Sequence, residues 1–91
     1  MKISFDQPKR DKCYEERGLA FEDAIHVFKG VTIEFEDTRF DYGETRMVCF
    51  GYLQGRLVVI GYVVRGDTRH IFSMRKANER ERNKIEPKLK V

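Results

Sequence analysis

Apolar residues near the start of the chain recur at the spacing of a helix. Four of them, at positions 21, 24, 25 and 28, form one stripe on a helix that Gly30 ends. An earlier helix is predicted for residues 8–17, because Asp6 can cap its first turn and Gly18 can adopt the left-handed conformation at its end. We therefore expect residues 1–30 to form a hairpin of two helices.

From residue 31 the pattern changes to the alternation of a β-strand. Apolar and polar residues alternate over 31–36, and further strands are predicted for 44–53, 56–64 and 68–74. The predicted strand 56–64 is apolar on both faces, so it should lie in the middle of the sheet. Short turns such as Gln54-Gly55 join antiparallel neighbours. Residues 31–75 are thus predicted to form a four-stranded antiparallel sheet.

The last predicted element is a C-terminal helix over residues 78–87. Asn78 and Glu81 have the spacing of a capping box, and Pro87 is expected to limit the helix. With Ile85 as its one large apolar residue, the helix should bury little in its own domain. The order of elements predicts a single α+β domain, 1–91, with the helical hairpin on one face of the sheet.

Composition limits the class of protein. The chain has 91 residues, of which 41% are hydrophobic and 36% charged, and this favours one globular domain. No apolar run approaches the roughly 20 residues of a membrane helix, and no secretory signal is visible, so the cytoplasm is the expected location. Cys13 and Cys49 are interpreted as reduced structural thiols. His26 and His70 lie far apart, which argues against a zinc site, and no metal or cofactor is expected.

The charge is unevenly distributed. Residues 1–64 carry 9 Lys and Arg against 11 Asp and Glu, a balance of −2, whereas residues 65–91 carry 9 against 4, a balance of +5. A basic C-terminal third can contact nucleic-acid phosphates or an acidic protein. A solvated charged tail explains the same composition equally well.

Arginines stand out on the predicted strands. Alternation places Arg69, Ser73 and Arg75 together on one face of the last strand, Glu44 and Arg46 share a face of the second, and Arg65 ends the central one. Such a surface can hold a phosphodiester without a metal, because guanidinium groups bind phosphate oxygens and stabilise the charge that develops during in-line attack by a 2′-hydroxyl.

Proton transfer would need a further side chain. Glu44 is a candidate general base, and His70 is a candidate general acid because histidine titrates near neutrality. The alternative is that the arginines are ordinary surface residues paired with Glu34, Glu36 and Asp37. The residues alone leave both interpretations open.

Three stretches of the chain resemble the BrnT toxins of bacterial type II toxin–antitoxin systems. They are Gly18–Ala24 with Val27-Phe28, Gly43–Arg46 leading to Gly51, and Ile71–Ala77 with Glu81-Arg82. With Gly55-Arg56 and the pair Tyr62 and Arg65, the likeness covers nearly the whole chain. Each motif is weak alone, but their order and spacing together are fairly specific.

The resemblance implies an endoribonuclease with a fold like that of the RelE toxins, which cleaves RNA and so inhibits translation and growth. It also implies neutralisation by a BrnA-type antitoxin, a ribbon-helix-helix DNA-binding protein. The expected complex is a two-to-two heterotetramer that reaches operator DNA only through the antitoxin. The alternative function is a catalytically inactive basic module that docks such a partner or nucleic acid.

Residue roles follow from the same resemblance and from the arginine pattern. The expected catalytic residues are Arg65, Arg75, Glu44 and Arg46. The expected RNA contacts are Arg69, Ser73, Lys76, His70 and Arg56. The expected antitoxin contacts are Arg80, Arg82 and Ile85. The chain departs from the family pattern at Arg17, Met74 and Ile85, where histidine, alanine and an aromatic residue are usual.

Overall fold

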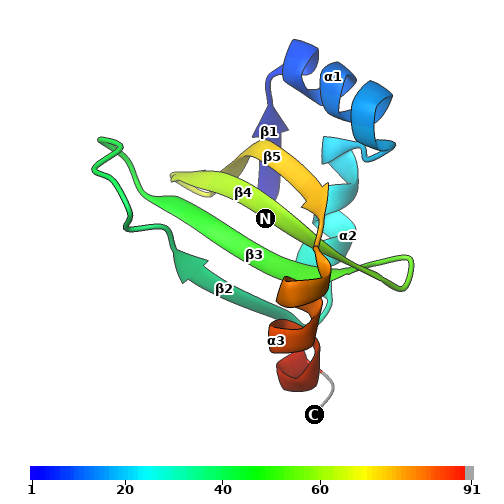
Figure 1. Ribbon diagram of the computed structural model, residues 1–91. Coiled ribbons are helices and arrows are strands. Elements are labelled where there is room, and N and C mark those ends of the chain that lie inside the picture. The colour runs from blue at the N-terminus through cyan, green and yellow to red at the C-terminus, as the bar shows by residue number, and fades with distance from the viewer. Residues whose placement is uncertain (90–91) are drawn as a thin grey trace.

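The computed structural model describes residues 1–89, which form one mixed sheet and helices on both of its faces (Figure 1). The strands are β1 (Lys2–Phe5), β2 (Thr32–Glu36), β3 (Arg46–Leu53), β4 (Arg56–Arg65) and β5 (Thr68–Lys76). The helices are α1 (Gln7–Arg17), α2 (Ala24–Lys29) and α3 (Glu79–Leu89). The strand order is β1-β5-β4-β3-β2. The predicted α+β class is therefore confirmed.

Both N-terminal helices form where the sequence predicts them. Asp6 caps α1 by accepting a hydrogen bond from the Lys9 amide at 3.3 Å, and Gly18 ends the helix with a φ of 70°. The second helix starts as a 3₁₀ turn at Phe21–Asp23 and continues as α2. Its apolar stripe packs on the sheet, because Phe21 and Val27 are both buried.

The sheet has one strand more than predicted, so the expectation of a four-stranded antiparallel sheet over residues 31–75 is wrong. The first segment, expected to lead into a helix, forms β1 and pairs in parallel with β5. Its own pattern is too short to specify a strand. Ile3 and Phe5 instead gain burial by packing on the core beside Phe21, whose ring lies 6.0 Å from that of Phe5.

One face of the sheet is covered by α1 and α2. The buried side chains between these helices and the sheet include Leu19, Phe21, Val27, Ile60 and Ile71. Cys13 and Cys49 belong to the same cluster, and both are free thiols. We call this side of the sheet the covered face.

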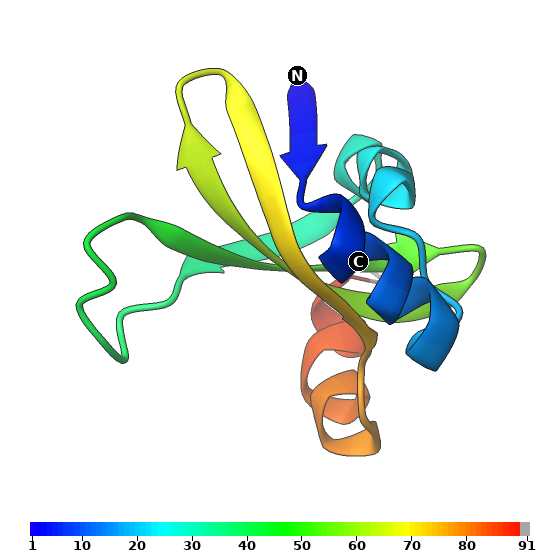
Figure 2. The ribbon, with the colours of Figure 1, turned by 90° about the horizontal axis from the view of Figure 1, so that it is seen from above.

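The opposite side, which we call the α3 face, carries the C-terminal helix at one end (Figure 2). The expectation that this helix buries little is wrong, because Ile85 and Leu89 pack on Phe50, Leu57 and Val59. The helix also continues through Pro87 to Leu89. Leu89 lies one turn beyond Ile85, and the two side chains together make the apolar stripe that holds α3 in place.

A β-bulge in β5 decides which side chains reach the α3 face. Gly61 pairs with Ser73 whereas Tyr62 pairs with Ile71, so Phe72 is the extra residue. The bulge shifts the alternation by one position. Arg69 therefore lies on the covered face, opposite to the side that carries Arg75, and the predicted grouping of these two arginines is wrong.

Candidate active site

We call the end of the α3 face away from helix α3 the polar end. A row of residues at this end runs across four strands. Ser4 of β1 pairs with His70 of β5, His70 pairs with Val63 of β4, and Val63 pairs with Arg46 of β3. Paired residues share a face, and the two strand steps from His70 to Arg46 span ~10 Å. His70 and Arg46 thus flank the small side chain of Val63 and can reach the same bound group.

Arg46 is held between two aromatic rings. Its guanidinium carbon lies 4.1 Å from the centre of the Tyr42 ring and 4.8 Å from that of Phe72. Its Nε is buried without a hydrogen-bond partner, and Arg46 forms no ion pair with any residue from 1 to 89. A partly buried positive charge without an acidic partner is costly unless a bound group of opposite charge compensates it. The arrangement therefore suits an anion.

A second arginine lies beside this row. Arg65 ends β4 two residues beyond Val63, and its Nη2 lies 3.7 Å from Oε1 of Glu44. The Arg65 side chain is 56% exposed. Glu44 thus positions a guanidinium that remains open to solvent and to a ligand.

The pKa of His70 is shifted by its surroundings. Burial, assisted by the positive charge of Arg65, lowers its pKa below the ordinary 6.5, while Glu44 acts in the opposite direction. Its Nδ1 lies 2.9 Å from Oγ of Ser4, which leaves Nε2 as the other ring nitrogen. At neutral pH the ring is uncharged and able to accept a proton.

Arg75 lies on the same face but at the other end. It pairs with Val59, which is six residues along β4 from Arg65, or ~20 Å. Its Nη1 and Nη2 bind the two carboxylate oxygens of Glu81 at 2.7 and 2.8 Å. Arg46, Arg65 and Arg75 therefore share one face, but Arg65 and Arg75 are too far apart to contact a single phosphate.

Comparison with protein families identifies the reaction, which the geometry alone does not specify. The family model described as "Ribonuclease toxin, BrnT, of type II toxin-antitoxin system" matches residues 5–81. The chain belongs to the BrnT family. It is thus a ribonuclease toxin that cleaves RNA and has an antitoxin as its partner. A search of curated proteins finds no match.

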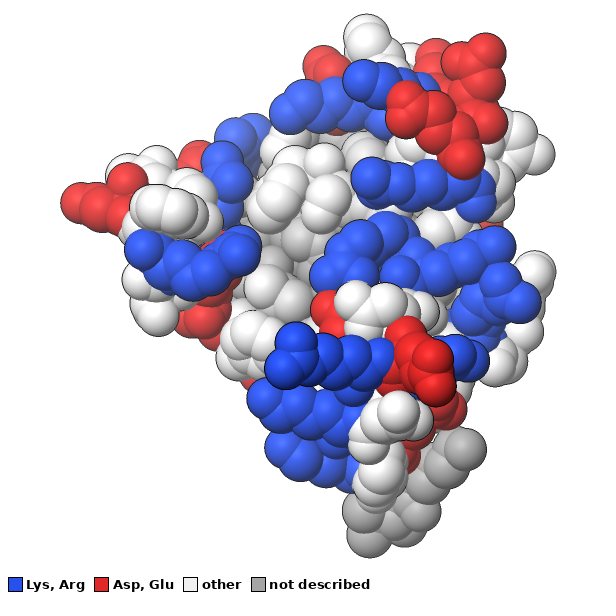
Figure 3. Space-filling model, viewed as in Figure 1, with Lys and Arg blue, Asp and Glu red and all other residues white. Residues whose placement is uncertain are grey.

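The charge distribution of this BrnT chain agrees with an RNA substrate. Lys and Arg side chains gather on the α3 face around an uncharged middle (Figure 3). Among residues 1–89, no group of three or more His, Cys, Asp and Glu side chains is placed to hold a metal ion. None of the described helices is long and apolar enough to cross a membrane.

The predicted RNA contacts divide between the two faces. Ser73 lies on the α3 face with His70. Arg69, on the covered face, binds Glu34 at 3.3 Å and stacks on the rings of Phe28 and Tyr62. The pairings of Arg56 and Lys76 place these two residues on the covered side as well. Three of the five expected RNA contacts therefore point away from the row that holds His70 and Arg46.

The departures from the expected family pattern lie at positions that support the fold. Arg17 donates a hydrogen bond to the carbonyl oxygen of Met74 at 3.0 Å, and this bond ties α1 to β5. The side chains of Met74 and Ile85 are buried. None of the three belongs to the row of His70 and Arg46.

Sequence reasoning missed the aromatic support of Arg46. Tyr42 comes from the loop before β3 and Phe72 from the bulge in β5. A Cβ added at Gly61 would lie 2.7 Å from the Phe72 ring, so the glycine leaves the space that this ring occupies. Tyr42 lies four residues before Arg46 but outside any strand, and Phe72 is the extra residue of a bulge. Strand alternation therefore gave no signal for either contact.

Proposed function

We propose that the chain is a metal-independent endoribonuclease whose active site is the polar end of the α3 face. The observation that carries the proposal is Arg46, a guanidinium that lies over two aromatic rings with no acidic partner among the described residues. A phosphodiester bound there meets Arg65 on one side and His70 on the other. The guanidinium groups of Arg46 and Arg65 would lie against the phosphate oxygens that gain negative charge in the transition state.

In the proposed reaction the 2′-oxygen of a ribose attacks the adjacent phosphorus atom. Neutral His70 takes the 2′-hydroxyl proton at Nε2, a bond forms between the 2′-oxygen and phosphorus, and the bond to the 5′-oxygen breaks. The leaving oxygen receives a proton from water, and the protonated His70 returns its proton to the hydroxide that remains. The products are a 2′,3′-cyclic phosphate and a 5′-hydroxyl.

The remaining charged residues have supporting roles in this proposal. Glu44, a candidate base from its sequence, is paired with Arg65, so we assign it the positioning of that guanidinium. Arg75 and Ser73 lie further along the same face and contact the RNA strand beyond the cleaved bond. We assign no direct RNA contact to Arg69, Arg56 or Lys76, because all three lie on the covered side.

The cellular role extends the family assignment. We propose that cleavage inhibits translation and growth in the cytoplasm, and that a BrnA-type ribbon-helix-helix antitoxin neutralises the toxin in a two-to-two complex. Operator DNA would then be contacted through the antitoxin. Arg80 and Arg82 are exposed on α3 and available to such a partner, whereas Ile85 is 6% exposed and serves the core of the chain itself.

The two histidines allow a matched test. His70→Ala should lower the rate of RNA cleavage by the purified protein about 10²–10⁴-fold, since a general base contributes that much. His26→Ala, which changes an exposed histidine of α2, should cleave like the wild type. The wild type should remain active in a chelator and should arrest growth when expressed without an antitoxin. Equal activity of the two variants would contradict the assigned base, and intact RNA with the wild type would favour a binding module.

A further inference from the structure

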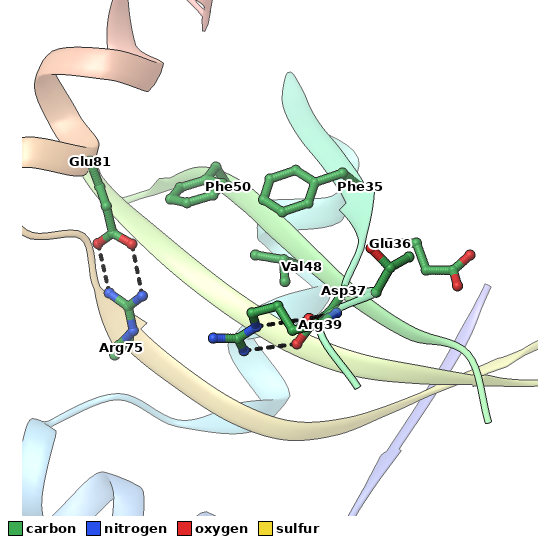
Figure 4. Close-up of a pocket in the computed structure, with 9 residues that line it drawn as sticks. Phe35, Glu36, Asp37, Arg39, Val48, Phe50, Arg75 and Glu81 are labelled. Atoms are coloured by element: carbon green, nitrogen blue, oxygen red, sulfur yellow. Dashed lines mark hydrogen bonds and ion pairs between the residues drawn. The ribbon is translucent and has the colours of Figure 1, made fainter. Parts of the chain in front are cut away.

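A hollow of about 470 Å³ lies on the α3 face next to the proposed active site (Figure 4). Its floor is apolar and comes from Phe35, Val48 and Phe50. One rim is the Arg75–Glu81 pair, and the other is Arg39 with Asp37, from the loop that follows β2. Val48 is two residues along β3 from Arg46, or ~7 Å. A group bound in the hollow is therefore close to the cleaved phosphodiester.

The two side chains of the loop rim are arranged so that donors face the hollow. Nε and Nη2 of Arg39 each bind a carboxylate oxygen of Asp37 at 2.9 Å. This leaves Nη1 and the outer hydrogen of Nη2 as a free pair of parallel donors. Asp37 also accepts a hydrogen bond from Tyr42, and its side chain is 10% exposed against 76% for Arg39. Figure 4 shows the guanidinium extending past Val48 toward Arg75.

The charge and the floor of the hollow restrict what can bind. The lining contains two arginines and three acidic residues, a balance of −1, which disfavours a phosphate. The ring of Phe35 is stacked on that of Phe50 with centres 6.1 Å apart, and Phe35 is 48% exposed. It offers a flat apolar surface on which an aromatic ring can stack. The fitting ligand is thus a neutral planar ring with acceptors on its edge.

We propose that this hollow binds a guanine base of the RNA substrate, with Arg39 reading its O6 and N7. Guanine is the one base that presents two adjacent acceptors on this edge, whereas adenine and cytosine place an amino donor there and uracil has a single acceptor. A guanidinium fork matches the guanine pair. The inference rests on the proposed function, because it requires RNA on the α3 face, and it predicts a preference for guanosine near the cleaved bond.

Binding of RNA that cannot be cleaved tests the inference separately from catalysis. The probes are 2′-O-methyl hexamers of adenosine in which one nucleotide is replaced by guanosine, inosine or 7-deazaguanosine. We expect the guanosine and inosine hexamers to bind the wild type about tenfold more tightly than the all-adenosine hexamer. The 7-deaza hexamer lacks N7 and should lose most of this gain. Fluorescence anisotropy measures all four.

Two variants assign the effect to the hollow. Arg39→Gln should reduce binding of the guanosine hexamer to the level of the adenosine hexamer and leave the latter within about twofold. Arg56→Gln, an exposed arginine of the covered side, is the matched control and should keep the preference. A wild type without a preference, or a preference that survives in Arg39→Gln, overturns the inference.

Two other outcomes are also decisive. An equal loss of affinity for every hexamer in Arg39→Gln would assign Arg39 to the backbone phosphates and overturn base reading. A wild type that discriminates between the hexamers but leaves ordinary RNA intact would refute the proposed catalysis and support the base-binding hollow. Absence of binding to any hexamer would contradict both proposals.

Discussion

Arg46 and Arg75 occupy the same face of the same sheet, yet they differ in what their charge can do. Arg75 forms two short hydrogen bonds with Glu81, which raise the pKa of its guanidinium and satisfy two of its nitrogens within the chain. Arg46 is held by ring faces, which orient its charge without neutralising it. The comparison shows that an arginine's partner, more than its position in the sequence, decides whether its charge is left available or is used within the fold.

Among the arginine substitutions considered, replacement of Arg46 is expected to have the largest effect on RNA cleavage. Arg46→Ala should lower kcat/KM for RNA cleavage about 10²–10³-fold, because a preorganised donor at the developing charge would be lost. Arg75→Ala should lower it far less. Steady-state kinetics on a short RNA would compare the two variants. Equal losses would remove the functional distinction between the two ends of the face.

The pH dependence of RNA cleavage tests the role of His70, which lies at the same end of the face as Arg46. A general base works in its neutral form, so kcat/KM should be constant near pH 7 and fall about tenfold per pH unit below the lowered pKa of His70. The midpoint should lie below 6.5, the ordinary value for histidine. A pH–rate profile of the wild type measures it. A midpoint above 6.5 would contradict the burial of this ring as the cause.

At the other end of the face the expected effect is on stability. Arg75→Ala should lower the free energy of unfolding by about 1–2 kcal/mol, because it leaves the Glu81 carboxylate without its charged partner. Arg46→Ala should lower it less, as no ion pair is lost. Urea denaturation at pH 7 would measure both. A more stable Arg75→Ala variant would show that this pair is retained for function.

Acid should remove the contribution of the same pair. The hydrogen bonds from Arg75 lower the pKa of Glu81 from 4.5 to about 2. A lowered folded-state pKa stabilises the protein above pH 4.5, and this stabilisation is lost as the pH falls toward about 2. Glu81→Gln should therefore show a weaker loss of stability over that range than the wild type. Identical pH profiles would mean that the pair contributes little.

Replacement of Glu44 is expected to have the smallest effect on RNA cleavage. Its contact with Arg65 is 3.7 Å long and exposed, and such pairs contribute little. Glu44→Gln should change kcat/KM only a few fold, whereas Glu44 acting as the base itself would give a loss of 10² or more. Single-turnover cleavage by the variant distinguishes the two roles.

Regular patterns of the sequence predicted most of the fold. The apolar stripe of α2, the capping residues of α1 and the turn between β3 and β4 all specify their structures locally. β1 could not be predicted in this way, because its pairing with β5 joins segments more than 60 residues apart. The α3 helix was underestimated because its burial depends on Leu89 as well as Ile85.

The candidate site was predictable only in part. Alternation correctly placed Arg46 on a face with Val48 and Phe50. The bulge at Phe72 reversed the alternation for Arg69, since an inserted residue leaves no mark on the periodic pattern. The rings that hold Arg46 come from a loop and from this bulge, so their contact exists only in the folded chain.

The position of β1 matters for anyone who shortens or extends this chain. Ser4 bonds to His70 from the outermost strand of the sheet, so deletion of the first five residues would expose the backbone of β5 to solvent. The exposed edge would exchange its amide hydrogens faster and offer a template for intermolecular strand pairing. A purification tag joined ahead of Met1 would end only a few residues before Ser4, which bonds to the histidine proposed to move the proton.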